Sequence, residues 1–110
     1  METKNRTLSK VLSTSNQDVY VAPARWNADV YSLIITNTSN ATKLITLEWY
    51  DSLSAAWYYL MKDTPLIANG IVQIEEPLYL AATDKIRGLA NANSTVVVTL
   101  RLREDFATAL

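Results

Sequence analysis

One segment near the end of this 110-residue chain restricts its fold more than any other. From Val96 to Leu102, every second residue is apolar. Successive side chains of a β-strand point to opposite faces of its sheet, whereas a helix repeats about every 3.6 residues. The apolar set is Val96, Val98, Leu100 and Leu102, and the opposite set is Thr95, Val97, Thr99, Arg101 and Arg103. The pattern therefore predicts a strand with one buried face and one face toward solvent.

Shorter stretches of β-branched and aromatic residues precede this segment, separated by turn-forming Asn, Asp, Ser and Pro. We expect strands at residues 18–22, 29–36, 42–50, 56–61, 71–74, 78–80 and 85–90, before the final strand over 94–103. Residues 7–14 fit either a first strand or an arm that orders on a partner. Within 42–50, the side chains of Ile45, Leu47 and Trp49 share the predicted core face. Strands spaced in this way predict an all-β, antiparallel β-sandwich of jelly-roll-like form with about eight strands.

Length and composition fit a single domain. Apolar residues make up 49% and charged residues 19% of the chain, which is typical of a folded globular protein. We expect an N-terminal arm over residues 1–17, the sandwich over 18–103 and a C-terminal tail over 104–110. Prolines place loops at residues 24–27, which carry Trp26, and at residues 62–70.

Two residue types that most enzymes and metal sites rely on are missing from the sequence. The chain has no histidine and no cysteine, so a histidine base, a thiolate nucleophile, a His/Cys zinc site and a disulfide are all excluded. Glu75 and Glu76 are adjacent, so on a strand their carboxylates would face opposite ways. We therefore predict a protein that is not an enzyme and that uses no cofactor or metal.

The distribution of charge and of apolar residues argues against two classes of partner. Net charge is −1 and no basic block is present, so we expect no nucleic-acid partner. No apolar run approaches the roughly 20 residues that span a bilayer, so we expect no membrane partner. Arg101 and Arg103 share one strand face, which is either a solvated face or a small anion site, and the solvated face is favoured.

Aromatic residues are the strongest candidates for contact with a partner. Trp57, Tyr58 and Tyr59 are consecutive, so both faces of their strand carry rings and one face is at least partly exposed. Trp and Tyr are enriched at protein interfaces, and exposed rings also stack on sugars, so both partners stay open, with a protein favoured. The candidate contact residues are Trp26, Tyr50, Trp57, Tyr58, Tyr59, Arg101 and Arg103.

The order of several short motifs resembles that of small β-sandwich virion proteins of tailed bacteriophages. The motifs are Val19 to Pro23, Thr36 to Ser39, Lys62 to Leu66 with Gly70, Pro77 to Leu80, Thr83 to Ile86, and Thr95 to Leu102. The match spans roughly residues 19–103. It departs from the family pattern at Arg25 and Thr83, where that pattern has glycine, so those two turns are expected to differ.

The resemblance implies a structural subunit of the virion, made in the host cytoplasm and carried in the particle. Its partners would be the major capsid protein or other virion proteins, and the subunit would be a homo-oligomer. We expect a head decoration or cement protein that stabilises the shell. The alternatives are a neck, tail or fibre-base component, and a carbohydrate-binding β-sandwich module that recognises host glycan.

Overall fold

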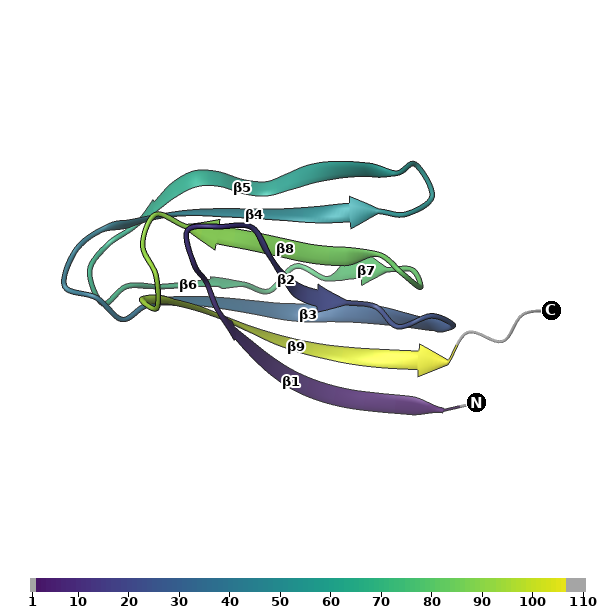
Figure 1. Ribbon diagram of the computed structural model, residues 1–110. Coiled ribbons are helices and arrows are strands. Elements are labelled where there is room, and N and C mark those ends of the chain that lie inside the picture. Colours follow the sequence, from purple (N-terminus) through teal and green to yellow (C-terminus); the bar gives the residue numbers. More distant parts are fainter. Residues whose placement is uncertain (1, 107–110) are drawn as a thin grey trace.

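The structure, a computed structural model that describes residues 2–106, is a β-sandwich of nine strands in two antiparallel sheets (Figure 1). The strands are β1 (Thr3–Val11), β2 (Gln17–Val21), β3 (Trp26–Asn37), β4 (Lys43–Asp51), β5 (Ala56–Leu66), β6 (Ile71–Ile74), β7 (Leu78–Leu80), β8 (Lys85–Ala90) and β9 (Val96–Phe106). The five-stranded sheet has the order β1-β9-β3-β6, with β7 also paired to β3, and the four-stranded sheet has the order β2-β8-β4-β5. The predicted all-β antiparallel sandwich is confirmed.

The long pair β3–β9 lies at the centre of the five-stranded sheet. Leu33 of β3 stands opposite Leu100 of β9, and Ile35 stands opposite Val98. All the apolar residues that alternate along β9 from Val96 to Leu102 are fully buried, as the sequence pattern predicted. The facing layer contributes Ile45 and Leu47 of β4 and Ile86 of β8 to the same core, with Trp49 packed against it.

A β-bulge interrupts the regular alternation of β3. Register shifts between Val30 and Ser32, so Tyr31 is the extra residue of this strand. Before the bulge Ala28 and Val30 are buried, and after it Leu33 is buried, so the core face changes from even to odd positions. A bulge of this kind redirects one side chain and bends the strand locally, and here the redirected side chain is that of Tyr31 on the outer face.

Several element ends differ from the sequence predictions. Trp26 begins β3 instead of lying in a loop, and β5 continues to Leu66 through part of the predicted loop 62–70. Pro65 is tolerated there because β5 is an edge strand, where a missing N–H breaks no ladder bond. The hydrogen-bond ladder with β4 carries the chain past the polar residues that suggested a loop.

The two ends of the sandwich also extend beyond the expected boundaries. β1 begins at Thr3, inside the predicted arm, and β9 continues through Phe106, inside the predicted tail. The reason is their mutual pairing, which runs from Thr3 opposite Asp105 to Val11 opposite Val97. Residues 107–110 of the predicted tail lie outside the described residues.

The buried side chain of Asn37 joins the turn between β3 and β4 to the end of β5. Asn37 is fully buried, and its Nδ2 atom donates to the carbonyl oxygens of Ala41, Leu66 and Ile67 at 2.8–3.0 Å. This side chain fixes the β3–β4 turn against the end of β5. Because a buried amide without partners would be costly, Asn37 has a structural role in this turn.

A buried carboxylate joins the two sheets at the other end of the sandwich. Glu104 on β9 is 2% exposed, accepts a hydrogen bond from the Tyr20 hydroxyl of β2, and lies 3.3 Å from the Arg6 guanidinium of β1. These two donors compensate the loss of hydration of the charge. Three strands are thus tied together by one side chain.

In the described part of the chain, six non-glycine residues have a left-handed backbone conformation, and two of them, Arg25 and Thr83, lie in the turns where the resemblance expects glycine. Trp26 N donates to Pro23 O at 3.0 Å around Arg25 (φ 69°), and Asp84 N donates to Ala81 O at 3.0 Å around Thr83 (φ 72°). Positive φ at the third residue of such a turn normally selects glycine. The backbone therefore keeps a glycine conformation at the two positions where this chain has Arg25 and Thr83.

Replacing Thr83 by glycine is expected to stabilise the protein. A β-branched residue at positive φ is strained, and relief of that strain exceeds the added flexibility of the unfolded chain, for a net gain of about 0.5–1 kcal/mol. Urea unfolding followed by circular dichroism measures the change. Ala82→Gly, at the preceding residue with negative φ, is the control and should destabilise. A lower midpoint for Thr83→Gly would contradict the assignment of strain.

Alkaline pH is expected to weaken the fold through Tyr20. Burial raises the pKa of Tyr20, and the hydrogen bond to Glu104 and its negative charge raise it further. An unfolded tyrosine ionises near pH 10, while the folded protein holds the Tyr20 proton to higher pH. Above about pH 10 the unfolded state therefore binds fewer protons, and the free energy of unfolding falls.

Urea unfolding at about pH 8 and about pH 11 tests this expectation, since the two values lie on either side of the ordinary tyrosine pKa. Wild type should lose more stability between these values than Tyr20→Phe, which cannot ionise there. Tyr79→Phe, at an exposed position, is the control and should behave like wild type. Equal losses in wild type and Tyr20→Phe would exclude Tyr20 as the source.

Candidate functional site

The outer face of the four-stranded sheet carries a group of aromatic and basic side chains from three strands. We call it the aromatic–cation patch; its residues are Tyr50 of β4, Trp57, Tyr59 and Lys62 of β5, and Lys85 and Arg87 of β8. Tyr50 stands opposite Trp57 on one side and opposite Lys85 on the other. Because directly opposed residues of neighbouring strands share a face, the pairing register assembles the patch.

Arg87 and Trp57 form the centre of the aromatic–cation patch. The Arg87 guanidinium carbon lies 3.7 Å from the centre of the Trp57 ring, and Arg87 Nε donates to Glu48 Oε1 at 3.1 Å. The ring of Tyr50 lies 4.9 Å from that of Trp57, with Lys85 Nζ 5.3 Å from Tyr50. Each of these side chains is fixed by at least one neighbour, so the patch is preorganised.

The edge of the patch is more exposed than its centre. Tyr59 is 56% exposed, and Lys62 Nζ lies 5.2 Å from its ring. Lys62, Lys85 and Arg87 bring three positive charges, Glu48 pairs with Arg87, and Asp18 of β2 stands opposite Arg87 on the same face. The patch therefore combines exposed aromatic surface with paired basic and acidic groups.

The structure does not bring all the predicted contact residues together. Tyr58 pairs with Trp49 on the other side of β5, with ring centres 5.5 Å apart. Trp26 lies at the end of the five-stranded sheet, 5.3 Å from the ring of Phe106, with Lys4 above it. Tyr58 is separate from Trp57 and Tyr59 because neighbouring positions on a strand face opposite ways, and Trp26 is separate because it belongs to the other sheet.

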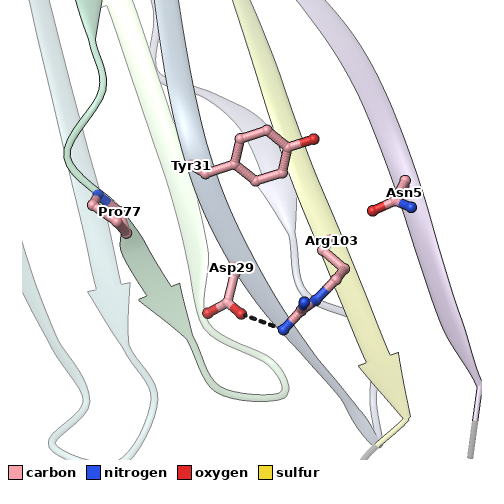
Figure 2. Close-up of a pocket in the computed structure, with 5 residues that line it drawn as sticks. All are labelled: Asn5, Asp29, Tyr31, Pro77 and Arg103. Atoms are coloured by element: carbon pink, nitrogen blue, oxygen red, sulfur yellow. Dashed lines mark hydrogen bonds and ion pairs between the residues drawn. The ribbon is translucent and has the colours of Figure 1, made fainter.

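Arg101 and Arg103 lie on the outer face of the five-stranded sheet, together with a depression of about 480 Å³. Figure 2 shows the residues that line it: Asn5 of β1, Asp29 and Tyr31 of β3, Pro77 before β7, and Arg103 of β9. Register explains the grouping, since Arg103 stands opposite both Asn5 and Asp29. The bulge adds Tyr31 to the same face.

Two carboxylates hold the Arg103 side chain in the depression. Arg103 Nη2 donates to Asp29 Oδ2 at 3.3 Å, and its Nε donates to Asp105 Oδ2 at 3.2 Å. These are exposed ion pairs, so their contribution to stability is small. Carboxylates occupy the positions beside Arg103 that a bound anion would take. The arrangement therefore favours a solvated face with paired charges over a small anion site.

Sequence reasoning missed most of the basic residues of the patch and most of the residues that line the depression, among them Lys85, Arg87 and Tyr31. Lys85 and Arg87 alternate along β8, so the sequence could have placed them on one face, but not beside Trp57. The sequence predicted a regular strand over residues 29–36, and it gave no sign of the bulge that the structure shows at Tyr31. The first omission concerns which strand lies next to which, and the second concerns an irregularity within one strand.

Residues 2–106 contain no group of three or more acidic residues arranged to hold a metal ion. Within the same residues, no helix is long and apolar enough to span a membrane.

Comparison with known proteins gives a structural neighbour but no family. No protein-family model matches the chain, and no curated protein matches it either. A chain from the solved structure titled "Bacillus endospore appendages form a novel family of disulfide-linked pili" is similar with a TM-score of 0.57 and 6% identity, covering 98% of this chain and 88% of that one. At this identity the likeness shows the shared fold alone.

A double-mutant cycle on Trp57 and Arg87 tests the centre of the patch. Trp57→Leu and Arg87→Met each remove the cation–π contact while keeping apolar bulk. We expect a coupling free energy of about 1 kcal/mol in urea unfolding, because the two groups are stacked and partly desolvated. Additive effects within a few tenths of a kcal/mol would show that the stacking contributes no stability.

Proposed function

We propose that this protein is a non-enzymatic structural subunit of a tailed-phage virion, a head decoration protein that binds the shell through the aromatic–cation patch. The proposal rests on the resemblance in motif order between residues 19 and 103 and on the geometry of the patch. The subunit acts by contact, with the sandwich as a rigid support. Binding the assembled shell more tightly than free shell subunits stabilises the shell by mass action.

The observation that carries the proposal is the preorganised cluster at Trp57 and Arg87. Trp, Tyr and Arg are the residues that most often dominate the binding energy of protein interfaces. Here their side chains are already fixed by stacking and by Glu48, so little conformational entropy is lost on docking.

The arrangement of Trp57 favours a protein partner over a sugar at this patch. Sugar stacking requires a free ring face, but the guanidinium of Arg87 lies against one face of Trp57. Tyr50 is inclined at 48° to the same ring with centres 4.9 Å apart, which leaves no flat, open platform. An uneven surface of this kind suits side chains from a partner protein.

A second line of support comes from the fold. The neighbour of similar fold belongs to pili described as disulfide-linked, so a sandwich of this type serves there in a repeating assembly. This chain has no cysteine, so its assembly would depend on non-covalent contacts. Many weakly bound copies on a symmetric lattice gain stability from multivalent contacts.

Substitutions in the patch are expected to release the protein from the particle. Trp57→Ala and Tyr59→Ala should each weaken binding to phage particles assembled without this protein by about tenfold or more, which is typical of buried aromatic anchors. Co-sedimentation with such particles measures the binding. Circular dichroism and urea unfolding should show that both variants keep the β-sandwich.

Tyr79→Ala is the matched control, because Tyr79 is similarly exposed (57%) but belongs to β7 in the other sheet. It should bind particles as wild type does. Unchanged binding by both patch variants would exclude this surface. A copy number of about a dozen or fewer per particle, where a decorated shell carries hundreds, would favour the neck, tail or fibre base.

A further inference from the structure

We propose that the depression on the outer face of the five-stranded sheet, formed by Tyr31, Arg103, Asp29 and Asn5, is a binding site for a neutral saccharide. The site lies on the opposite side of the sandwich from the aromatic–cation patch. It therefore adds a second activity to the proposed function and does not require it. The inference follows from one exposed ring and three planar polar side chains gathered around it.

Tyr31 supplies the stacking surface. This side chain lies on the outer face at the bulge in β3, where it is 36% exposed. In Figure 2 the ring is seen face on, lying across β9 with its hydroxyl directed toward β1. The face of an aromatic ring carries partial negative charge, which attracts the weakly positive C–H groups on the flat side of a pyranose.

Arg103 supplies oriented donors beside that ring. Its guanidinium has five N–H groups, and the contacts with Asp29 and Asp105 use two of them. Within residues 2–106 the other N–H groups have no protein acceptor. Arg103 lines the depression, so its remaining donors are available to a ligand there.

Asp29 and Asn5 complete the polar lining. Asp29 uses one carboxylate oxygen for Arg103, which leaves the other as an acceptor for a ligand hydroxyl. The Asn5 amide on the far side of β9 offers both a donor and an acceptor. A sugar hydroxyl donates and accepts at once, so vicinal hydroxyls match this mixture of groups better than a simple anion does.

The balance of charge selects a neutral ligand. Arg101 and Arg103 bring two positive charges to this face, and Asp29, Asp105 and Glu75, which accepts from Ser32 opposite Arg101, bring three negative charges, so the face does not select an anion. Arg101 lies 5.5 Å from the centre of the Tyr31 ring, farther than the 3.7 Å that separates Arg87 from the ring of Trp57, so it does not lie against the ring as Arg87 does. An acidic sugar would meet Asp29 directly, so the site favours neutral hexoses and N-acetylhexosamines.

Titration of the ¹⁵N-labelled full chain with neutral oligosaccharides of glucose, galactose, mannose and N-acetylglucosamine tests the proposal. At least one sugar should shift the backbone amides around Tyr31, Asp29 and Arg103, with millimolar or tighter affinity. Tyr31→Ala should weaken binding by about tenfold or more, because the stacking surface is lost. Arg103→Lys keeps the charge but loses the fork of donors, and should weaken binding severalfold.

Tyr58→Ala is the matched control, since Tyr58 is an exposed tyrosine (48%) away from the depression, and it should bind sugar as wild type does. The unfolding midpoint of each variant separates loss of the site from loss of the fold. The proposal is overturned if no sugar in the panel shifts these amides, or if shifts cluster at Trp57 and Tyr50. Particle binding by Tyr31→Ala should stay intact, so this site and the proposed function fail independently.

Discussion

The antiparallel pairing of β3 with β9 is the interaction on which the rest of the structure depends. This pair runs the length of the five-stranded sheet and sends an unbroken row of buried aliphatic residues into the core, from Val96 to Leu102 on β9 and from Leu33 to Ile35 on β3. Burial of such side chains is the main driving force for folding. β1 is then added to the free edge of β9, and β6 and β7 to that of β3, so each outer strand depends on this central ladder.

The same ladder also creates the outer surfaces. Because alternate residues point outward, Arg101, Arg103 and Asp29 are brought into one row as a direct consequence of the register that buries Val98 and Leu100. The bulge at Tyr31 adds a ring without disturbing the core, since the chain recovers its inward alternation at Leu33. In the other sheet, the pairing of β4 with both β5 and β8 places Trp57 and Lys85 on either side of Tyr50. Both proposed surfaces are products of strand pairing.

Several features were predictable because they depend on neighbours in the chain. The alternation of Val96 to Leu102 and of Ile45 and Leu47 identified buried strand faces correctly. The ends of strands were less predictable: polar residues before Pro65 suggested a loop, yet pairing with β4 keeps that segment in β5. The turns at Arg25 and Thr83 show the same limit, because the fold imposes on them a backbone conformation that their side chains disfavour.

The sequence by itself determined that this chain forms strands, which faces of them are apolar, and that histidine and cysteine chemistry is absent. These properties follow from residue type and from the period of two, both of which are local. Only the tertiary structure decided that Arg103 meets Asp29 across 74 positions of sequence and that Arg87 covers Trp57. Strand order, register and bulges arise from packing the two layers as a whole, and a period of two fixes the face of a side chain without fixing its neighbour.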